Sequence, residues 1–171
     1  MIFEVESRVG ASINDTQIGD SNANTINGGA GNDVIHGGGG LDTLIGGVGN
    51  DTLYSDNSIA SFNGGDDTDT VDFSGRTESP YHYYHPAGVY VNLLHHVVGY
   101  DGPFHHEWEP EGTIVNVENV NGTNFADTLI GDYNNNVLNG NGGNDALTGG
   151  YCQHTIFLFR THAAGEFGNE T

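Results

Sequence analysis

The chain has 171 residues, of which 23 are acidic and 3 are basic, and its formal charge is −20. This charge argues against binding to nucleic acid, whose phosphates require a basic face, and against attraction to an anionic membrane surface. No run of about 18 apolar residues is present, so no transmembrane helix is predicted. Low hydrophobicity with high net charge is typical of disorder, so the chain is either disordered or neutralised by a cation when it folds.

The N-terminal segment, residues 1–9, contains a predicted short strand at 2–6 that would cap the neighbouring repeats. Residues 10–72 then divide into seven consecutive nonapeptides. The three at 28–36, 37–45 and 46–54 share Gly at positions 1, 2 and 4, Asp at position 6 and an aliphatic residue at position 8. The position-8 residues predict an inward-facing apolar row, consisting of Ile26, Ile35, Leu44, Leu53, Phe62 and Val71.

Each nonapeptide predicts a turn over positions 1–6 and a short strand over positions 7–9, because glycine permits tight turns and side chains alternate along a strand. Two nonapeptides complete one coil of a parallel β-roll, so repeats two apart stack on the same edge. The position-6 residues then lie side by side, with Asp15, Asp33, Asp51 and Asp69 on one edge and Asn24, Asp42 and Ala60 on the other. Carboxylates this close require a cation between them, and calcium accepts carboxylate and carbonyl oxygens.

Residues 73–121 break the strict repeat and contain a His- and Tyr-rich segment, whose histidines are His82, His85, His95, His96, His105 and His106. One interpretation is a transition-metal site, but the spacing matches no recognised site, and Pro110 excludes an H-E-x-x-H motif. The alternatives are an aromatic-rich loop packed over the roll, with extra strands at 88–93 and 113–120, or contact with carbohydrate through Tyr and Trp. No catalytic motif emerges, so we expect no enzymatic activity.

The repeat resumes over residues 122–157, where the position-8 residues are Leu129, Leu138, Leu147 and Ile156. Asp127 and Asp145 would face each other in successive coils. Asn136 would face His154, but imidazole is a poor calcium ligand and we expect no site there. Residues 158–171 form a C-terminal tail that begins with the end of an apolar stretch.

The G-G-x-G-x-D-x-U-x pattern, found over residues 10–72 and 114–157, resembles that of the RTX, or haemolysin-type, calcium-binding repeat proteins. The resemblance implies an all-β, right-handed parallel β-roll (a β-solenoid) with several bound Ca²⁺ ions and the aromatic and His-rich segment as an insertion. It also implies how each ion is held. One loop gives the carbonyls of positions 2 and 4 and its Asp, and the next gives the carbonyls of positions 1 and 3 and its Asp.

Mapped onto this sequence, the resemblance implies several calcium sites. The first two combine Gly29, Gly31 and Asp33 with Gly46, Val48 and Asp51, and Gly47, Gly49 and Asp51 with Gly64, Asp66 and Asp69. A third would combine Ala11, Ile13 and Asp15 with Gly28, Ala30 and Asp33. The remaining candidates are Asn24 with Asp42, and Asp127 with Asp145 and the carbonyls of Gly140 and Gly142. Asp42 also faces Ala60, which offers no ligand, so we expect that site to be weak or lost.

The leading hypothesis is a secreted, non-enzymatic calcium-binding β-roll with a structural or interaction role, located outside the cell or at its surface. In the family, low cytosolic calcium leaves the chain unfolded for export and extracellular calcium then folds it. One alternative is a subunit that self-assembles into a surface layer or filament. Another is an accessory module of a secreted enzyme, such as a protease, lipase, alginate epimerase or lyase. An extracellular polysaccharide is a further candidate partner, and a metal-dependent activity of the His-rich segment is a weaker hypothesis.

Overall fold

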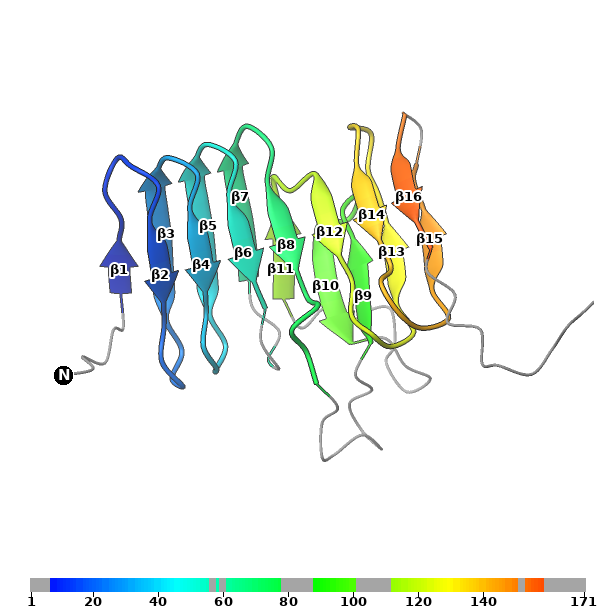
Figure 1. Ribbon diagram of the computed structural model, residues 1–171, viewed down its shortest axis with the longest axis horizontal. Helices are drawn as coiled ribbons and strands as arrows, with labels where there is room; N and C mark the ends of the chain where they lie inside the picture. Colours follow the sequence, from blue (N-terminus) through cyan, green and yellow to red (C-terminus); the bar gives the residue numbers. More distant parts are fainter. Residues whose placement is uncertain are drawn as a thin grey trace, which may run out of the picture.

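The computed structural model describes residues 7–55, 58, 61–77, 88–100, 112–150 and 153–158. Within these residues the chain forms sixteen short strands and no helix. The strands stack into a parallel β-solenoid of about seven turns, and its coils follow one another along the long axis of the molecule (Figure 1). The predicted all-β parallel solenoid is therefore confirmed. A search of the described residues also finds no helix long and apolar enough to cross a membrane.

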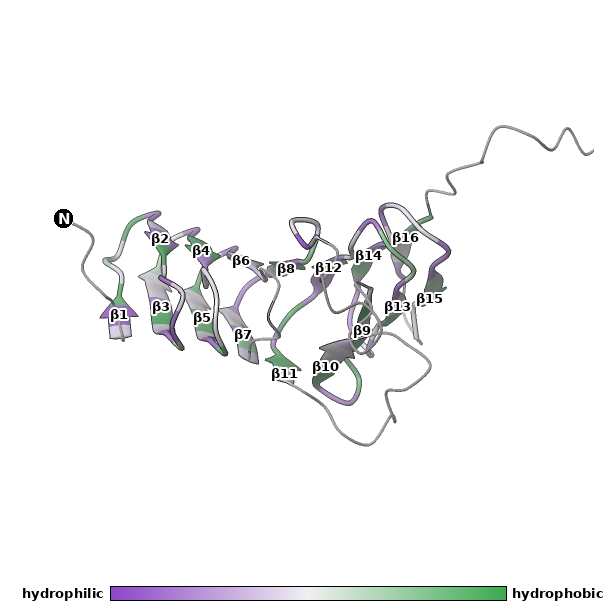
Figure 2. Cartoon of the chain, turned by 90° about the horizontal axis from the view of Figure 1, so that it is seen from below, coloured by the Kyte–Doolittle hydropathy of each residue, from purple (hydrophilic) through white to green (hydrophobic). Residues whose placement is uncertain are grey.

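Two sheets form the walls of the solenoid and are seen as two layers in Figure 2. The first has nine strands in the order β1 (Ser7–Val9), β3 (Thr25–Ala30), β5 (Thr43–Val48), β7 (Ser61–Asp66), β11 (Gly112–Val115), β10 (Val97–Tyr100), β9 (Val89–Asn92), β13 (Thr128–Ile130) and β15 (Ala146–Thr148). The second has seven, in the order β16 (Thr155–Phe157), β14 (Val137–Asn139), β12 (Asn119–Asn121), β8 (Thr70–Asp72), β6 (Thr52–Tyr54), β4 (Val34–His36) and β2 (Thr16–Ile18).

Repeats two apart pair in register, as the nine-residue period predicts. Ile26 of β3 lies opposite Leu44 of β5, and Ile35 of β4 lies opposite Leu53 of β6. Three strands of the first sheet are longer than predicted, because β3, β5 and β7 continue through the first three positions of the next repeat. The glycines of these positions pair with one another across the coils, so the loops themselves belong to the ladder.

The position-8 side chains fill the space between the two sheets. All six predicted in the first block are at most 1% exposed, and Leu129 and Leu138 are equally buried. Gln17 holds the same position in the first coil and is buried too, where its Nε2 donates a hydrogen bond to the Asn27 carbonyl at 3.0 Å. Toward the C-terminal end Leu147 is only partly buried and Ile156 is 40% exposed, because β15 and β16 are the last strands of their sheets among the described residues.

Segment 73–121 adds four strands to the solenoid. The first two, β9 and β10, form an antiparallel hairpin that lies in the first sheet between β11 and β13. The other two form a coil, since β11 pairs in parallel with β7 and β12 pairs in parallel with β8. The strand expected at 88–93 is thus confirmed. The one expected at 113–120 is instead two strands in different sheets, joined by a turn at 116–118 in which Asn116 has a φ of 52°.

Candidate metal centre

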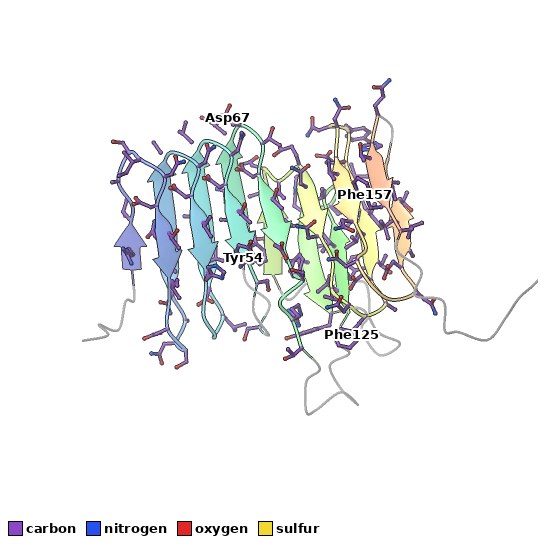
Figure 3. All side chains as sticks on the ribbon, in the orientation of Figure 1. Tyr54, Asp67, Phe125 and Phe157 are labelled. Carbon is purple, nitrogen blue, oxygen red and sulfur yellow. The ribbon has the colours of Figure 1, made fainter. Side chains whose placement is uncertain are left out.

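The loops that join the first sheet to the second lie along the upper edge of the solenoid in Figure 1, and one of them carries Asp67, labelled in Figure 3. The position-6 carboxylates form a ladder along this edge. The backbone N–H of Asp15 donates to Oδ1 of Asp33 at 2.7 Å, that of Asp33 to Asp51 at 2.7 Å, and that of Asp51 to Asp69 at 2.8 Å. The structure therefore brings together the three pairs that the sequence predicts.

Three carboxylates of this ladder bury a second oxygen that has no partner within the described residues. Oδ2 of Asp33, Asp51 and Asp69 has no hydrogen-bond partner within the described part of the chain, and each of these residues is at most 1% exposed. A buried polar atom without a partner costs about 1–3 kcal/mol, and more if it is charged. Three such oxygens in a row on one edge fit a row of cations.

The pKa values of the carboxyls reflect the same burial. Burial, together with the negative charges of Asp51, Glu118 and Asp67, raises the pKa of Asp69 to about 7, although the hydrogen bond from the Asp51 backbone acts to lower it. Burial also raises the pKa of Asp51, with smaller contributions from Asp33 and Asp67. The ladder is thus an unfavourable place for negative charge, and a cation would reverse this penalty.

The glycine at position 1 keeps the space in front of each carboxylate open. A Cβ placed on Gly28 would overlap Oδ2 of Asp33 and lie 2.6 Å from the carbonyl oxygen of Gly46 in the next coil. The same crowding occurs at Gly46, where the neighbouring atoms are Oδ2 of Asp51 and the carbonyl oxygen of Gly64. The Asp of one loop and the position-1 carbonyl of the next therefore converge, as the implied ligand sets require.

Backbone conformation separates the loops into two kinds. Positions 2 and 4 have positive φ in three loops of the upper edge. The two φ angles are 104° and 117° in loop 28–33, 120° and 120° in loop 46–51, and 120° and 81° in loop 64–69, where the last value belongs to Asp67. Here Oδ2 of the Asp has no partner within the described residues. The lower-edge loops at 37–42 and 140–145 also have positive φ at positions 2 and 4. We call loops of this kind open loops.

In the other kind, which we call closed loops, the position-2 N–H turns inward to the position-6 side chain. The donor and acceptor residues are Ala11 and Asp15 (2.7 Å), Asp20 and Asn24 (3.3 Å), Thr123 and Asp127 (2.7 Å), and Asp132 and Asn136 (2.9 Å). None of these loops has Gly at positions 2 and 4. Since this hydrogen bond occupies an oxygen that would otherwise face an ion, we expect weaker binding where Asp15, Asn24 or Asp127 contributes.

The lower edge in Figure 1, on which Phe125 of Figure 3 lies, carries the other predicted pairs. The Asn24 N–H donates to Oδ1 of Asp42 at 2.9 Å, and the Asp127 N–H donates to Oδ1 of Asp145 at 3.1 Å. Burial raises the pKa of Asp127 to about 6 and also raises that of Asp145. Ala60 lies outside the described residues. On the upper edge the Asn136 N–H lies 3.3 Å from Nδ1 of His154, so these two residues are adjacent, as predicted.

Sequence reasoning missed Glu118, which continues the upper ladder beyond the first block. Its Oε2 accepts the backbone N–H of Asp69 at 2.9 Å, as Oδ1 of Asp69 accepts that of Asp51. A signal for this role was present in the sequence. Glu118 directly precedes strand β12 in the way that Asp69 directly precedes strand β8.

The ligands available on the two edges are pairs of carboxylates and backbone carbonyl oxygens. Among the described residues, no three His, Cys, Asp or Glu side chains lie close enough to hold a metal ion by themselves. A cation on either edge would therefore need backbone carbonyls beside its two carboxylates, and carbonyl and carboxylate oxygens suit a hard ion such as Ca²⁺. Of the six clustered histidines only His95 and His96 are described, so the transition-metal interpretation of that segment lies mostly outside the described residues.

Comparison with known proteins identifies the repeat. The family described as RTX calcium-binding nonapeptide repeat (4 copies) matches residues 18–53 and 121–150, which lie in the two blocks of the solenoid. No curated protein matches the chain. The matched residues, the parallel solenoid and the buried Asp ladder together show that the chain is an RTX calcium-binding nonapeptide repeat protein.

Proposed function

We propose that this chain is a secreted calcium-binding β-roll that folds when it binds Ca²⁺ and has a structural or interaction role instead of a catalytic one. The observation that carries the proposal is the ladder of buried carboxylates, in which Oδ2 of Asp33, Asp51 and Asp69 has no partner within the described residues. Calcium ions between the coils would neutralise these charges and join each coil to the next.

The small core supports coupling between calcium and folding. Each nonapeptide buries one apolar side chain, which contributes about 1.5–3 kcal/mol. Ordering each of its nine residues costs about 1–2 kcal/mol of backbone entropy. Backbone hydrogen bonds and bound metal must supply much of the difference, so the free energy of calcium binding becomes free energy of folding.

The coupling between calcium binding and folding suits a secreted protein. RTX repeats are typical of secreted proteins. An affinity of about 10⁻⁴–10⁻³ M, as in extracellular calcium modules, would leave the chain unfolded inside the cell and fold it outside. Folding then takes place after export, where the ion is abundant.

Far-UV circular dichroism of the full chain, with calcium and with excess chelator, tests this proposal. We expect a β-sheet spectrum in calcium and a largely unfolded spectrum in chelator. Magnesium should replace calcium poorly, because it demands a smaller octahedral site and dehydrates reluctantly. A β spectrum that persists unchanged in excess chelator would contradict the proposal.

A second candidate function is end-to-end self-association into a layer or filament. It is favoured by exposed apolar side chains on the terminal coils, namely Val9, Ile13 and Ile18 at one end and Ile156, Phe157 and Leu158 at the other. The strands at these ends are the last in their sheets among the described residues, and edge strands invite pairing with another chain. Sedimentation with and without calcium tests this function, and a strict monomer at high concentration in calcium would count against it.

A further inference from the structure

The first block meets segment 112–121 at a coil whose upper turn is unusually short. Strand β11 pairs with β7 so that Ile114 lies opposite Phe62, and β12 pairs with β8 so that Asn119 lies opposite Thr70. The chain therefore passes from one sheet to the other through residues 116–118 alone, whereas the coil beside it uses the six residues 64–69. The turn lacks a glycine loop, yet it stacks directly on an open loop.

This short turn supplies the same oxygen atoms that a repeat loop supplies. A Cβ placed on Gly64 would lie 2.5 Å from Oδ2 of Asp69 and would overlap the carbonyl oxygen of Asn116. In the preceding coil the corresponding atoms are Oδ2 of Asp51 and the carbonyl oxygen of Gly64. The Asn116 carbonyl thus takes the place of a position-1 carbonyl. The Asn116 side chain fixes the turn, since its Nδ2 donates to Oδ1 of Asn63 at 2.9 Å.

Glu118 supplies the carboxylate of the upper loop. Its Oε2 receives the Asp69 N–H at 2.9 Å, close to the 2.8 Å between the Asp51 N–H and Asp69. A glutamate side chain is one methylene longer than an aspartate, and this extra length offsets the shorter turn.

One oxygen of the Asp69 carboxyl, Oδ2, points into this junction. Asp69 is fully buried, and its Oδ2 has no hydrogen-bond partner among the described residues. Neither of the two arginines that the structure describes is placed to neutralise it. The Arg76 guanidinium lies over the ring of Tyr100, 4.8 Å from its centroid, and Arg8 lies on β1, the first strand of its sheet.

The difference in loop length leaves a recess over the turn. The six-residue loops 64–69 and 131–136 flank it, and an open pocket at this place is lined by Gly65, Asn116, Val117, Glu118, Asp132 and Asn134, among others. The recess gives an ion access from solvent. It also leaves room for water molecules, which complete a calcium shell of 6–8 oxygens.

We propose that Asp69, Glu118 and the carbonyl oxygen of Asn116 form an additional Ca²⁺ site, the junction site, which joins the first block to the coil of β11 and β12. The inference rests on the proposed calcium binding. Residues 64–118 lie outside the two matched stretches, so the nonapeptide pattern does not include this site. The ion would carry the carboxylate ladder across the interruption and dock the following coil on the first block.

Calcium stoichiometry of the full chain tests the junction site. Equilibrium dialysis at saturating calcium should show one ion fewer in Glu118→Gln than in the wild type, because the amide keeps an acceptor for the Asp69 N–H but removes the charge. Asp72→Asn is the matched control. Asp72 lies on β8, and its Oδ2 accepts a hydrogen bond from Asn121 Nδ2 at 2.9 Å. This variant removes one carboxylate from the same pair of coils but leaves the upper edge unchanged, so it should bind the wild-type number of ions.

An unchanged stoichiometry in Glu118→Gln would overturn the junction site but leave the other calcium sites standing, whereas a wild type that binds no calcium would overturn the proposed function. A crystal structure of the wild type grown in calcium decides the question even if Glu118→Gln fails to fold. An ion about 2.3–2.6 Å from Oδ2 of Asp69 and the Glu118 carboxylate is expected. A water molecule or hydrogen-bonded carboxyl pair at that place would refute the inference.

Discussion

Replacing Asp51 by Asn, which exchanges one carboxylate oxygen for an amide nitrogen, should weaken two calcium sites. Asp51 is 1% exposed and lies in the middle of the upper ladder. Its Oδ1 accepts the Asp33 N–H at 2.7 Å, and its own N–H donates to Asp69 at 2.8 Å. The amide side chain of the variant keeps an acceptor oxygen and nearly the same volume, so the backbone ladder is preserved. The charge, however, is removed from the predicted site below Asp51 and from the one above it.

The size of the effect follows from ligand linkage. For dissociation constants of about 10⁻⁴–10⁻³ M, calcium at about 10 mM stabilises the folded chain by about 1.4–2.7 kcal/mol per site. Loss of two sites should therefore lower the free energy of unfolding by about 3–5 kcal/mol in calcium. Asp15→Asn is the matched control, because Asp15 belongs to one predicted site and its Oδ2 already accepts the Ala11 N–H at 2.7 Å. We expect this control to lose at most about half as much.

Calcium titrations followed by circular dichroism measure the midpoint of folding for the three proteins. Asp51→Asn should require clearly more calcium than the wild type, and Asp15→Asn should lie between them. Urea unfolding at about 10 mM calcium gives the free energies. If Asp51→Asn folds at the wild-type calcium concentration and binds the wild-type number of ions, then Asp51 does not bridge two sites and the interpretation of the ladder is wrong.

Three further predictions concern the loop, the core and pH. Gly46→Ala should raise the calcium midpoint and destabilise the fold by about 1–3 kcal/mol, because its Cβ would overlap Oδ2 of Asp51, whereas Gly75→Ala, which meets nothing within 4 Å, should behave as the wild type in the same titration. Leu53→Ala should cost about 2–5 kcal/mol in urea unfolding with calcium present, whereas Leu41→Ala, at a side chain 71% exposed, should change the free energy of unfolding by less than about 0.5 kcal/mol. The pKa values of Asp69 and Asp127 are raised, to about 7 and about 6, so the calcium-free fold binds protons more tightly than the unfolded chain does. The calcium-free fold therefore gains stability as pH falls from about 7 toward the ordinary carboxyl pKa of 3.8, and it loses stability as pH rises. The calcium-free chain should therefore show more residual β structure by circular dichroism at pH about 5 than at pH about 8, and residual structure that falls on acidification over this range would contradict the buried ladder.

The repeating part of the fold could be predicted from the sequence because one short unit specifies every coil. The nine-residue period alone places Ile26 opposite Leu44 and Asp33 beside Asp51, and the structure confirms both. What the period does not specify is whether a given loop is open or closed. This depends on whether positions 2 and 4 adopt positive φ, and Asp67 does so at 81° without being glycine.

Segment 73–121 could be predicted only in part, because it follows no period. Apolar alternation indicates the strand that became β9, but β10 contains Gly99 and gave no such signal. The segment 113–120, read from the sequence as one strand, concealed a turn, since Asn116 has positive φ and divides the segment between two sheets. Glu118 was missed for the same reason, because its place in the ladder becomes visible only once that turn is known.

The two walls of the solenoid do not have the same number of strands. The hairpin of β9 and β10 adds two strands to the first sheet, and the second sheet passes directly from β12 to β14. At a spacing of about 4.8 Å between strands, one wall is longer than the other by roughly 10 Å. This is the geometry of an edge dislocation in a crystal, where an extra half-plane ends inside the lattice. The extra length must be taken up where the hairpin lies, by a bow of the longer wall or by an angle between the coils on its two sides, so the hairpin is a fixed defect in an otherwise uniform stack.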